Sequence, residues 1–98
     1  MCFVKKARFS DLAELDLTET WFYIARDNPS AADRLVERIL KTCDLLAQGR
    51  HAGEGRDDLS PGARIFTVAP YVVVFRPSEE GIEVIRVIHS ARDIDSLF

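Results

Sequence analysis

The stretch RDNPSAADR (residues 26–34) decides the fold, because it ends one helix and starts another. A residue that precedes proline disfavours helical backbone, so Asn28 is predicted to stop the first helix. Pro29 suits the first position of the next helix, where the backbone N–H has no helical partner in any case. Ser30 and Asp33 stand three residues apart, as in a capping box. Two helices with so short a link are predicted to form an antiparallel hairpin.

The helix before this link is predicted to start at Ser10 or Asp11, either of which can cap it, and to run to about Asp27. Its apolar residues cover more than one face, although a helix packed on one side needs only one apolar stripe. The extra apolar surface indicates either a second layer within the fold or a binding partner. The helix after the link has a single clean stripe, formed by Ala32, Leu35, Val36, Ile39, Cys43 and Leu46.

Strand signals flank the two helices. FVKKARF (3–9) alternates loosely, and its lysines suit a strand at the edge of a sheet. ARIFTV (63–68), YVVVFR (71–76) and IEVIRVIH (82–89) are rich in β-branched and aromatic residues. Short, turn-like links join these three strands, which predicts antiparallel neighbours.

The last of these strands is apolar on both faces and is therefore predicted to be central. Simple alternation places Val84, Arg86 and Ile88 on the same face. The order strand, helix, helix, strand, strand, strand predicts an α+β fold. An N-terminal strand and an antiparallel two-helix hairpin would pack with a mostly antiparallel sheet of three to four strands.

Chain length, net charge and cysteine content limit which classes of function are compatible with the sequence. We predict one domain over residues 1–98, with a C-terminal tail at 91–98. Thirteen Lys and Arg against 16 Asp and Glu give a net charge of −3, which argues against nucleic acid as the main ligand. The two cysteines lack ligand spacing, so we expect no metal and no cofactor. The N-terminus lacks the apolar core of a signal peptide, and the longest nearly apolar run (65–75) is too short for a bilayer, so we expect a cytoplasmic protein.

The charged turn GRDDLSPGAR (55–64) raises a choice between catalysis and structure. Its Ser-Pro-Gly sequence predicts a type II turn. Asp57 and Asp58 are adjacent, so in an extended chain their carboxylates diverge and make a poor acid/base pair. We predict a structural brace, in which one aspartate pairs with Arg64 or Arg86 and replacement of either aspartate lowers stability.

Four segments together resemble the ParE branch of the RelE/ParE toxin superfamily: YIARDNPSAADR (23–34), LAQGRHAGEGRDDLSPGARIF (46–66), YVVVFRP (71–77) and VIRVIHSARDIDSLF (84–98). The resemblance covers nearly the whole chain in order. It implies the toxin of a type II toxin–antitoxin system, silenced by a ParD-type antitoxin that wraps the toxin in a hetero-oligomer. Several ParE toxins poison DNA gyrase, so the resemblance implies gyrase as target and contact with DNA only through the antitoxin.

The RelE relatives within the superfamily instead cut mRNA on the ribosome. Metal-free RNA cleavage needs a base, an acid and positive charge on the phosphate. The candidates for these roles are His89, Arg86, Arg64 and Arg56. No lysine follows Lys41, whereas RelE-type nucleases carry lysines on the sheet. We therefore expect a binder that is not an enzyme, with an mRNA endonuclease as the alternative. A third possibility is an inactive remnant that only represses its own operon with the antitoxin.

Binding residues are expected in two places. Surplus apolar side chains are expected to bind the antitoxin, namely Trp21, Phe22, Tyr71, Val73 and Phe75. By family analogy, the target is expected to contact the tail, through Arg92, Asp93, Leu97 and Phe98.

Overall fold

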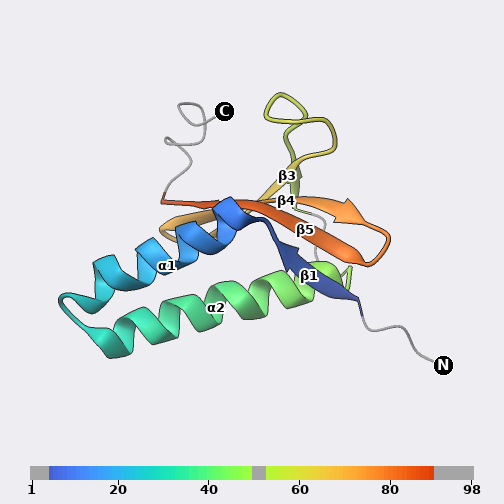
Figure 1. Ribbon diagram of the computed structural model, residues 1–98. Helices are drawn as coiled ribbons and strands as arrows, with labels where there is room; N and C mark the ends of the chain where they lie inside the picture. Colours follow the sequence, from blue (N-terminus) through green and yellow to red (C-terminus); the bar gives the residue numbers. More distant parts are fainter. Residues whose placement is uncertain (1–4, 50–52, 90–98) are drawn as a thin grey trace.

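Two helices lie on one face of a five-stranded sheet in the computed structural model (Figure 1). The structure describes residues 5–49 and 53–89. Its elements in chain order are β1 (Lys6–Phe9), α1 (Asp11–Ala25), α2 (Pro29–Ala47), β2 (Glu54–Gly55), β3 (Arg64–Val68), β4 (Tyr71–Ser78) and β5 (Gly81–Ile88). The predicted α+β class, the helical hairpin and the mostly antiparallel sheet are confirmed.

The strands follow the spatial order β1-β5-β4-β3-β2. β1 lies at one edge, as its lysines predict, and pairs with β5 in parallel. The other neighbours are antiparallel. β5 lies inside the sheet between β1 and β4, in agreement with its apolar character. The two-residue strand β2 at the opposite edge was not predicted, because two residues carry no alternation to read.

Both helices begin at a side-chain cap. The Ser10 hydroxyl accepts a hydrogen bond from the Ala13 amide (3.0 Å), and the Asn28 side chain accepts one from the Ala31 amide (3.1 Å). Each cap satisfies a backbone N–H that the first helical turn leaves unpaired. The predicted capping box at Ser30 is wrong, because Asn28 is the cap and Ser30 already lies inside α2.

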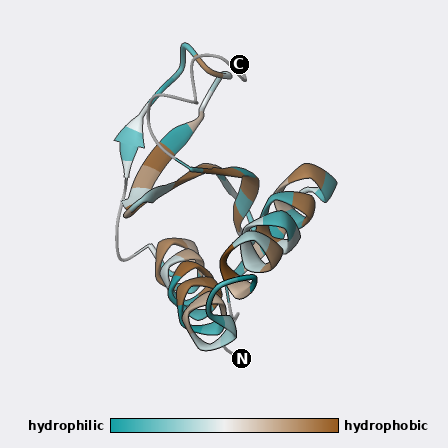
Figure 2. Ribbon diagram, turned by 90° about the vertical axis from the view of Figure 1, so that its left-hand side faces the viewer, coloured by the Kyte–Doolittle hydropathy of each residue, from teal (hydrophilic) through white to brown (hydrophobic). Residues whose placement is uncertain are grey.

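The main core lies between the helices and the sheet. The predicted α2 stripe faces it, with Ile39 and Cys43 fully buried. From β4, Val73 and Phe75 join this core, whereas Val72 and Val74 join a smaller cluster on the other face. Figure 2 views the helices nearly end-on and shows hydrophobic residues recurring along both helices and the strands beside them. Because alternate residues point to opposite faces, β4 is buried on both sides of the sheet.

A β-bulge interrupts β5. Phe75 pairs with Val84 but the preceding residue, Val74, pairs with Arg86, so Ile85 is an extra residue on β5. A bulge changes which face the following side chains occupy. Val84 accordingly belongs to the helix-side core, while Ile88 belongs to the cluster on the other face. The predicted shared face of Val84 and Ile88 is therefore wrong.

The start of α1 replaces β1 as the hydrogen-bonding neighbour of β5. β1 ends at Phe9, opposite Val84. The Ser10 amide then donates to the Val84 carbonyl (3.0 Å), and the Ser10 hydroxyl donates to the Ile85 carbonyl (2.7 Å). Ser10 thus caps the helix and continues the sheet edge at the same time.

Asp16, in the second turn of α1, closes the same edge further along. Its carboxylate accepts two hydrogen bonds from the Arg86 guanidinium (2.8 and 3.0 Å) and a third from the Val87 amide (3.0 Å). The ion pair is mostly buried, because only 11% of the Asp16 side chain and 19% of the Arg86 side chain are exposed. One carboxylate therefore fixes α1, the bulge and the open edge of β5 together.

Replacing Asp16 by alanine should destabilise the fold by about 2–4 kcal/mol, because a mostly buried arginine and a strand amide would lose their partner. Urea unfolding measures this loss. Glu83→Ala is the matched control, since it breaks the exposed Arg76–Glu83 pair (3.0 Å), which is expected to contribute at most about 1 kcal/mol. Equal losses for the two variants would contradict the proposed importance of Asp16.

Gly81 is required where β1 meets β5. It pairs with Lys6 and has φ +140°, and a Cβ at this position would collide with the Lys6 backbone. Gly81→Ala should therefore cost about 3 kcal/mol or more and loosen β1. Gly49→Ala is the control, because Gly49 has φ +78° but open space around its Cβ position; its expected loss is about 1–2 kcal/mol. Thermal unfolding of both variants checks the difference, and a smaller loss for Gly81→Ala would refute it.

Candidate functional site

The charged turn between β2 and β3 is held by its own aspartates. Asp58 accepts two hydrogen bonds from the Arg56 guanidinium (both 2.9 Å), and Asp57 accepts one from the Gly62 amide (2.9 Å). The hydrogen bond from Arg56 is also the main reason that the pKa of Asp58 lies below its usual value. The Ala63 amide donates to the Ser60 carbonyl (2.9 Å).

These contacts favour the structural interpretation of the turn. Gly62 has φ +79°, as a type II turn requires, so the predicted turn is confirmed. The partner predicted for Arg86 is wrong, because Arg86 binds Asp16 of α1 rather than Asp57 or Asp58. Arg64 donates to the Gly53 carbonyl (3.0 Å) and thereby ties β3 to the segment before β2.

Sheet register keeps two of the nuclease candidates apart. Arg64 lies opposite Phe75 across β3 and β4, and Phe75 lies opposite Val84 across β4 and β5. His89 comes five positions after Val84, so the backbones of Arg64 and His89 are separated by roughly 15 Å along the strands. A general base and the cation that binds the same phosphate need to lie within hydrogen-bond reach of the reacting atoms. The described fold does not bring these two residues to one point.

The other two candidates are held by carboxylates. The Asp16 hydrogen bonds raise the pKa of Arg86 and leave its charge balanced. Arg56 forms the ion pair with Asp58. His89 follows β5 as an exposed residue and packs edge-on against the Tyr71 ring, with 5.1 Å between the ring centroids.

The residues expected to bind the antitoxin divide into exposed and buried ones. Phe22 is exposed, and the half-buried Trp21 packs edge-on against it (5.2 Å between centroids). Tyr71, Val73 and Phe75 are at most 5% exposed. The expectation that these three residues form a free binding surface is wrong, because their alternate positions on β4 turn them into the helix-side core.

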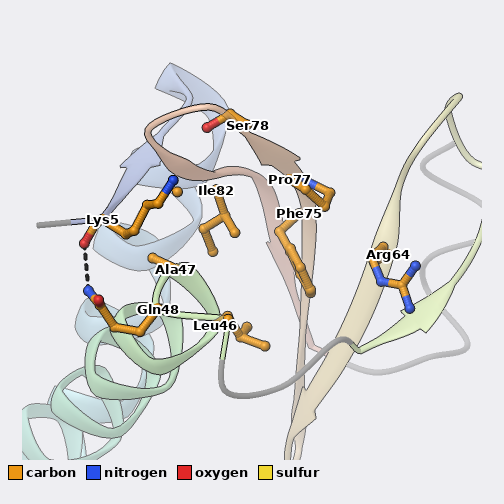
Figure 3. Close-up of a pocket in the computed structure, with 11 residues that line it drawn as sticks. Lys5, Leu46, Ala47, Gln48, Arg64, Phe75, Pro77, Ser78 and Ile82 are labelled. Atoms are coloured by element: carbon orange, nitrogen blue, oxygen red, sulfur yellow. Dashed lines mark hydrogen bonds between the residues drawn. The ribbon is translucent and has the colours of Figure 1, made fainter. Parts of the chain in front are cut away.

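A hollow of about 470 Å³ opens beside the end of α2 (Figure 3). Leu46, Phe75 and Ile82 form its apolar wall, with Lys5 and Arg64 on opposite sides of it. Sequence reasoning missed this hollow because its lining comes from distant segments. The only member that sequence analysis singled out as a binding residue was Phe75. An apolar side chain would fit this wall, whereas Lys5 and Arg64 already donate hydrogen bonds to the Glu79 and Gly53 carbonyls.

Other chemistry-bearing groups offer no site in the described part of the chain. Cys43 is fully buried, and burial raises the pKa of its thiol to about 12, with a smaller effect from Asp44.

Within residues 5–49 and 53–89, no three His, Cys, Asp or Glu side chains gather as metal ligands. Over the same ranges, the helices are too short or too polar to cross a membrane. The tail residues expected to contact the target lie outside the described residues, namely Arg92, Asp93, Leu97 and Phe98.

Comparisons with known proteins agree with this fold. Residues 7–94 match the family model described as the ParE toxin of the type II toxin–antitoxin system parDE. The protein Y4kP of Sinorhizobium fredii is 33% identical over 88 residues, which is 88% of each chain. Toxin RelE2 of Caulobacter vibrioides is 30% identical over 77 residues, covering 79% of this chain and 85% of the relative.

A solved structure titled as the chromosomal ParDE TA system from P. aeruginosa contains a chain of the same fold. It superposes with a TM-score of 0.71 at 24% identity, over 91% of this chain and 99% of that one. The family match spans the two helices and the strands β3 to β5, together with most of β1. The chain thus belongs to the ParE family of toxins from type II toxin–antitoxin systems.

Proposed function

We propose that this ParE-family toxin inhibits DNA gyrase in the cytoplasm by binding it, and that a ParD-type antitoxin neutralises the toxin. The observation that carries the non-enzymatic part is the pairing of sheet cations with carboxylates. Arg86 is held by Asp16, and Arg76 of β4 is held by Glu83 of β5. A guanidinium already bound in both arms by a carboxylate has little left to offer a phosphate.

The same pairing argues against the mRNA endonuclease. Cleavage would require an arginine to exchange its carboxylate for a phosphodiester next to a base. His89 is the strongest candidate base, but Arg64 starts a strand at the other end of the sheet. The charge and the register therefore both support binding rather than phosphodiester chemistry.

Two surfaces suit the antitoxin. The hollow beside α2 offers an apolar wall of Leu46, Phe75 and Ile82, which fits an anchoring apolar side chain of a peptide partner. The exposed Phe22, packed against Trp21, offers a rigid aromatic contact of the kind that dominates many interfaces. The hollow and Phe22 belong to different parts of the helical layer, in keeping with a partner that wraps the toxin.

Induction of the toxin in bacteria should cause DNA breaks, an SOS response and filamentation, since a trapped gyrase leaves cleaved DNA. Purified toxin should also inhibit DNA supercoiling by gyrase, and its complex with the antitoxin should not. A reporter of DNA damage and a supercoiling assay measure these effects. Growth arrest with intact DNA and fully active gyrase would refute the target, and the absence of any growth defect would favour the inactive remnant.

His89→Ala should leave toxicity within about twofold of the original chain, because His89 lies exposed beside Tyr71 and, among the described candidates, Arg86 is bound by Asp16 and Arg64 lies far along the sheet. Purified toxin added to translating ribosomes should leave mRNA intact, as primer extension would show. Cleavage in the ribosomal A site that disappears in His89→Ala would establish the endonuclease instead. An unfolded variant is recognised by circular dichroism, so loss of activity through misfolding is distinguishable.

A further inference from the structure

The exposed side of α2 carries two parallel stripes of opposite charge. Residues that are alternately four and three positions apart lie beside one another on a helix surface. One series with this spacing, which we call the α2 basic stripe, consists of Arg34, Arg38, Lys41 and Leu45. The series that begins one residue earlier is the α2 acidic stripe and consists of Asp33, Glu37, Leu40 and Asp44. All of these residues are exposed, so neither stripe is part of the core.

The two stripes border different parts of the fold. Asp33 accepts a hydrogen bond from the indole N–H of Trp21 (2.7 Å), so the acidic stripe borders α1. Arg38 donates a long hydrogen bond to the Ala69 carbonyl in the turn between β3 and β4 (3.4 Å). Ala69 and Pro70 are themselves exposed. The basic stripe therefore lies beside a small apolar turn, on the side of α2 that faces away from α1.

The cations of the basic stripe have no carboxylate partner among the described residues. Arg34, Arg38 and Lys41 form no ion pair there, although Glu37 lies within one helical turn of them. The whole chain has a net charge of −3, so a general excess of positive charge does not explain the stripe. Unpaired guanidinium and ammonium groups keep their donors available for carboxylates of another molecule.

The acidic stripe restricts what can bind to the basic one. A broad polyanion such as a DNA duplex would lie across both stripes and be repelled by Glu37 and Asp44. A narrow acidic segment can follow the cations alone, which extend over about 10 Å from residue 34 to residue 41. A sideways shift would bring its carboxylates against the acidic stripe, and this repulsion fixes its position. Leu45, which is 44% exposed, offers an apolar contact at the end of the stripe.

Surface chemistry also indicates when this partner is met. The apolar side chains left in solvent on α1 need a lasting cover, and more than half of each is exposed: Leu12, Leu15, Phe22 and Tyr23. Charged side chains are well solvated, so the basic stripe needs no cover while the toxin is free. Attraction between opposite charges accelerates the encounter of two molecules in solution. The basic stripe therefore suits a target that the free toxin must find, rather than a permanent partner.

We propose that the α2 basic stripe is a target-binding surface, which docks an acidic segment of the target protein beside Leu45 and the β3–β4 turn. The inference rests on the proposed function in one respect, because it requires that the target is a protein. It adds a surface of the described fold to the tail (91–98), where sequence analysis expects the target contact.

The test compares two triple variants of the full chain that remove the same charge. The stripe variant is Arg34→Gln/Arg38→Gln/Lys41→Gln, and the control variant is Lys6→Gln/Arg8→Gln/Arg26→Gln, which removes exposed cations of β1 and of the end of α1. The toxin concentration that half-inhibits DNA supercoiling by gyrase should rise at least about tenfold for the stripe variant and stay within about twofold for the control variant. Added salt should weaken the original toxin more than the stripe variant.

The apolar end of the stripe is tested separately. Leu45→Ser should weaken gyrase inhibition and leave its salt dependence unchanged, because it removes a contact but no charge. Leu40→Ser is the matched control, since Leu40 is an equally exposed leucine (42%) of the acidic stripe. Equal effects of the two serine variants would contradict the placement of Leu45 in the contact.

The outcomes separate this inference from the proposed function. Equal inhibition by the stripe and control variants overturns the inference and leaves gyrase inhibition intact. If the original toxin leaves gyrase active, the proposed target is refuted. Growth arrest then decides the inference: arrest lost only in the stripe variant supports it, and equal arrest by both variants overturns it.

Two other occupants of the stripe are distinguishable. Calorimetry should show an antitoxin affinity of the stripe variant within about threefold of the original, and a loss as large as that for the target would refute the inference in favour of the antitoxin. Binding of a DNA duplex without gyrase, lost in the stripe variant, would refute it in favour of DNA. Circular dichroism verifies the fold of each variant, and the single substitution Arg38→Gln keeps the test available should the triple variant unfold.

Discussion

The three hydrogen bonds of the Asp16 carboxylate are the constraint on which the arrangement of helix and sheet depends. Two go to Arg86 and one to the Val87 amide, just after the β-bulge of β5. β1 is too short to cover the whole of β5, and an uncovered strand edge invites pairing with other chains. Asp16 and Ser10 supply the missing partners from α1, so the helix serves as the continuation of the sheet edge.

Local signals in the sequence were sufficient for the order of elements. The proline after Asn28 predicts the link of the helical hairpin, and the single apolar stripe of α2 predicts its buried face. Both signals are local, because each depends only on residues within about two helical turns. The bulge at Ile85 was not predictable in this way. The bulge depends on how β5 pairs with β4 while it also contacts α1. Because of this one extra residue, the side chain of Ile88 lies on the face opposite to the predicted one.

The candidate site was less predictable than the fold, since its residues come from distant segments. The need of Arg86 for a carboxylate was predictable, but its predicted partner was Asp57 or Asp58 of the charged turn, whereas its actual partner is Asp16, 70 positions away. Aromatic and β-branched residues of β4 looked equally suited to a partner or to a core. Sheet geometry resolves the ambiguity, because β4 has neighbours on both edges and covered faces on both sides, which buries Tyr71 and Val73.

A small domain has a limited capacity to bury apolar side chains, and this limit connects the fold with binding. A chain of 98 residues leaves a larger share of its surface in solvent than a longer chain does. Here β4 and α2 already occupy the interior, so α1 can bury only its inner side. Its remaining leucines and aromatics would be a liability in a protein that acts alone. They are consistent with a protein whose resting state is a complex, in which the partner completes the hydrophobic layer that the chain is too short to build.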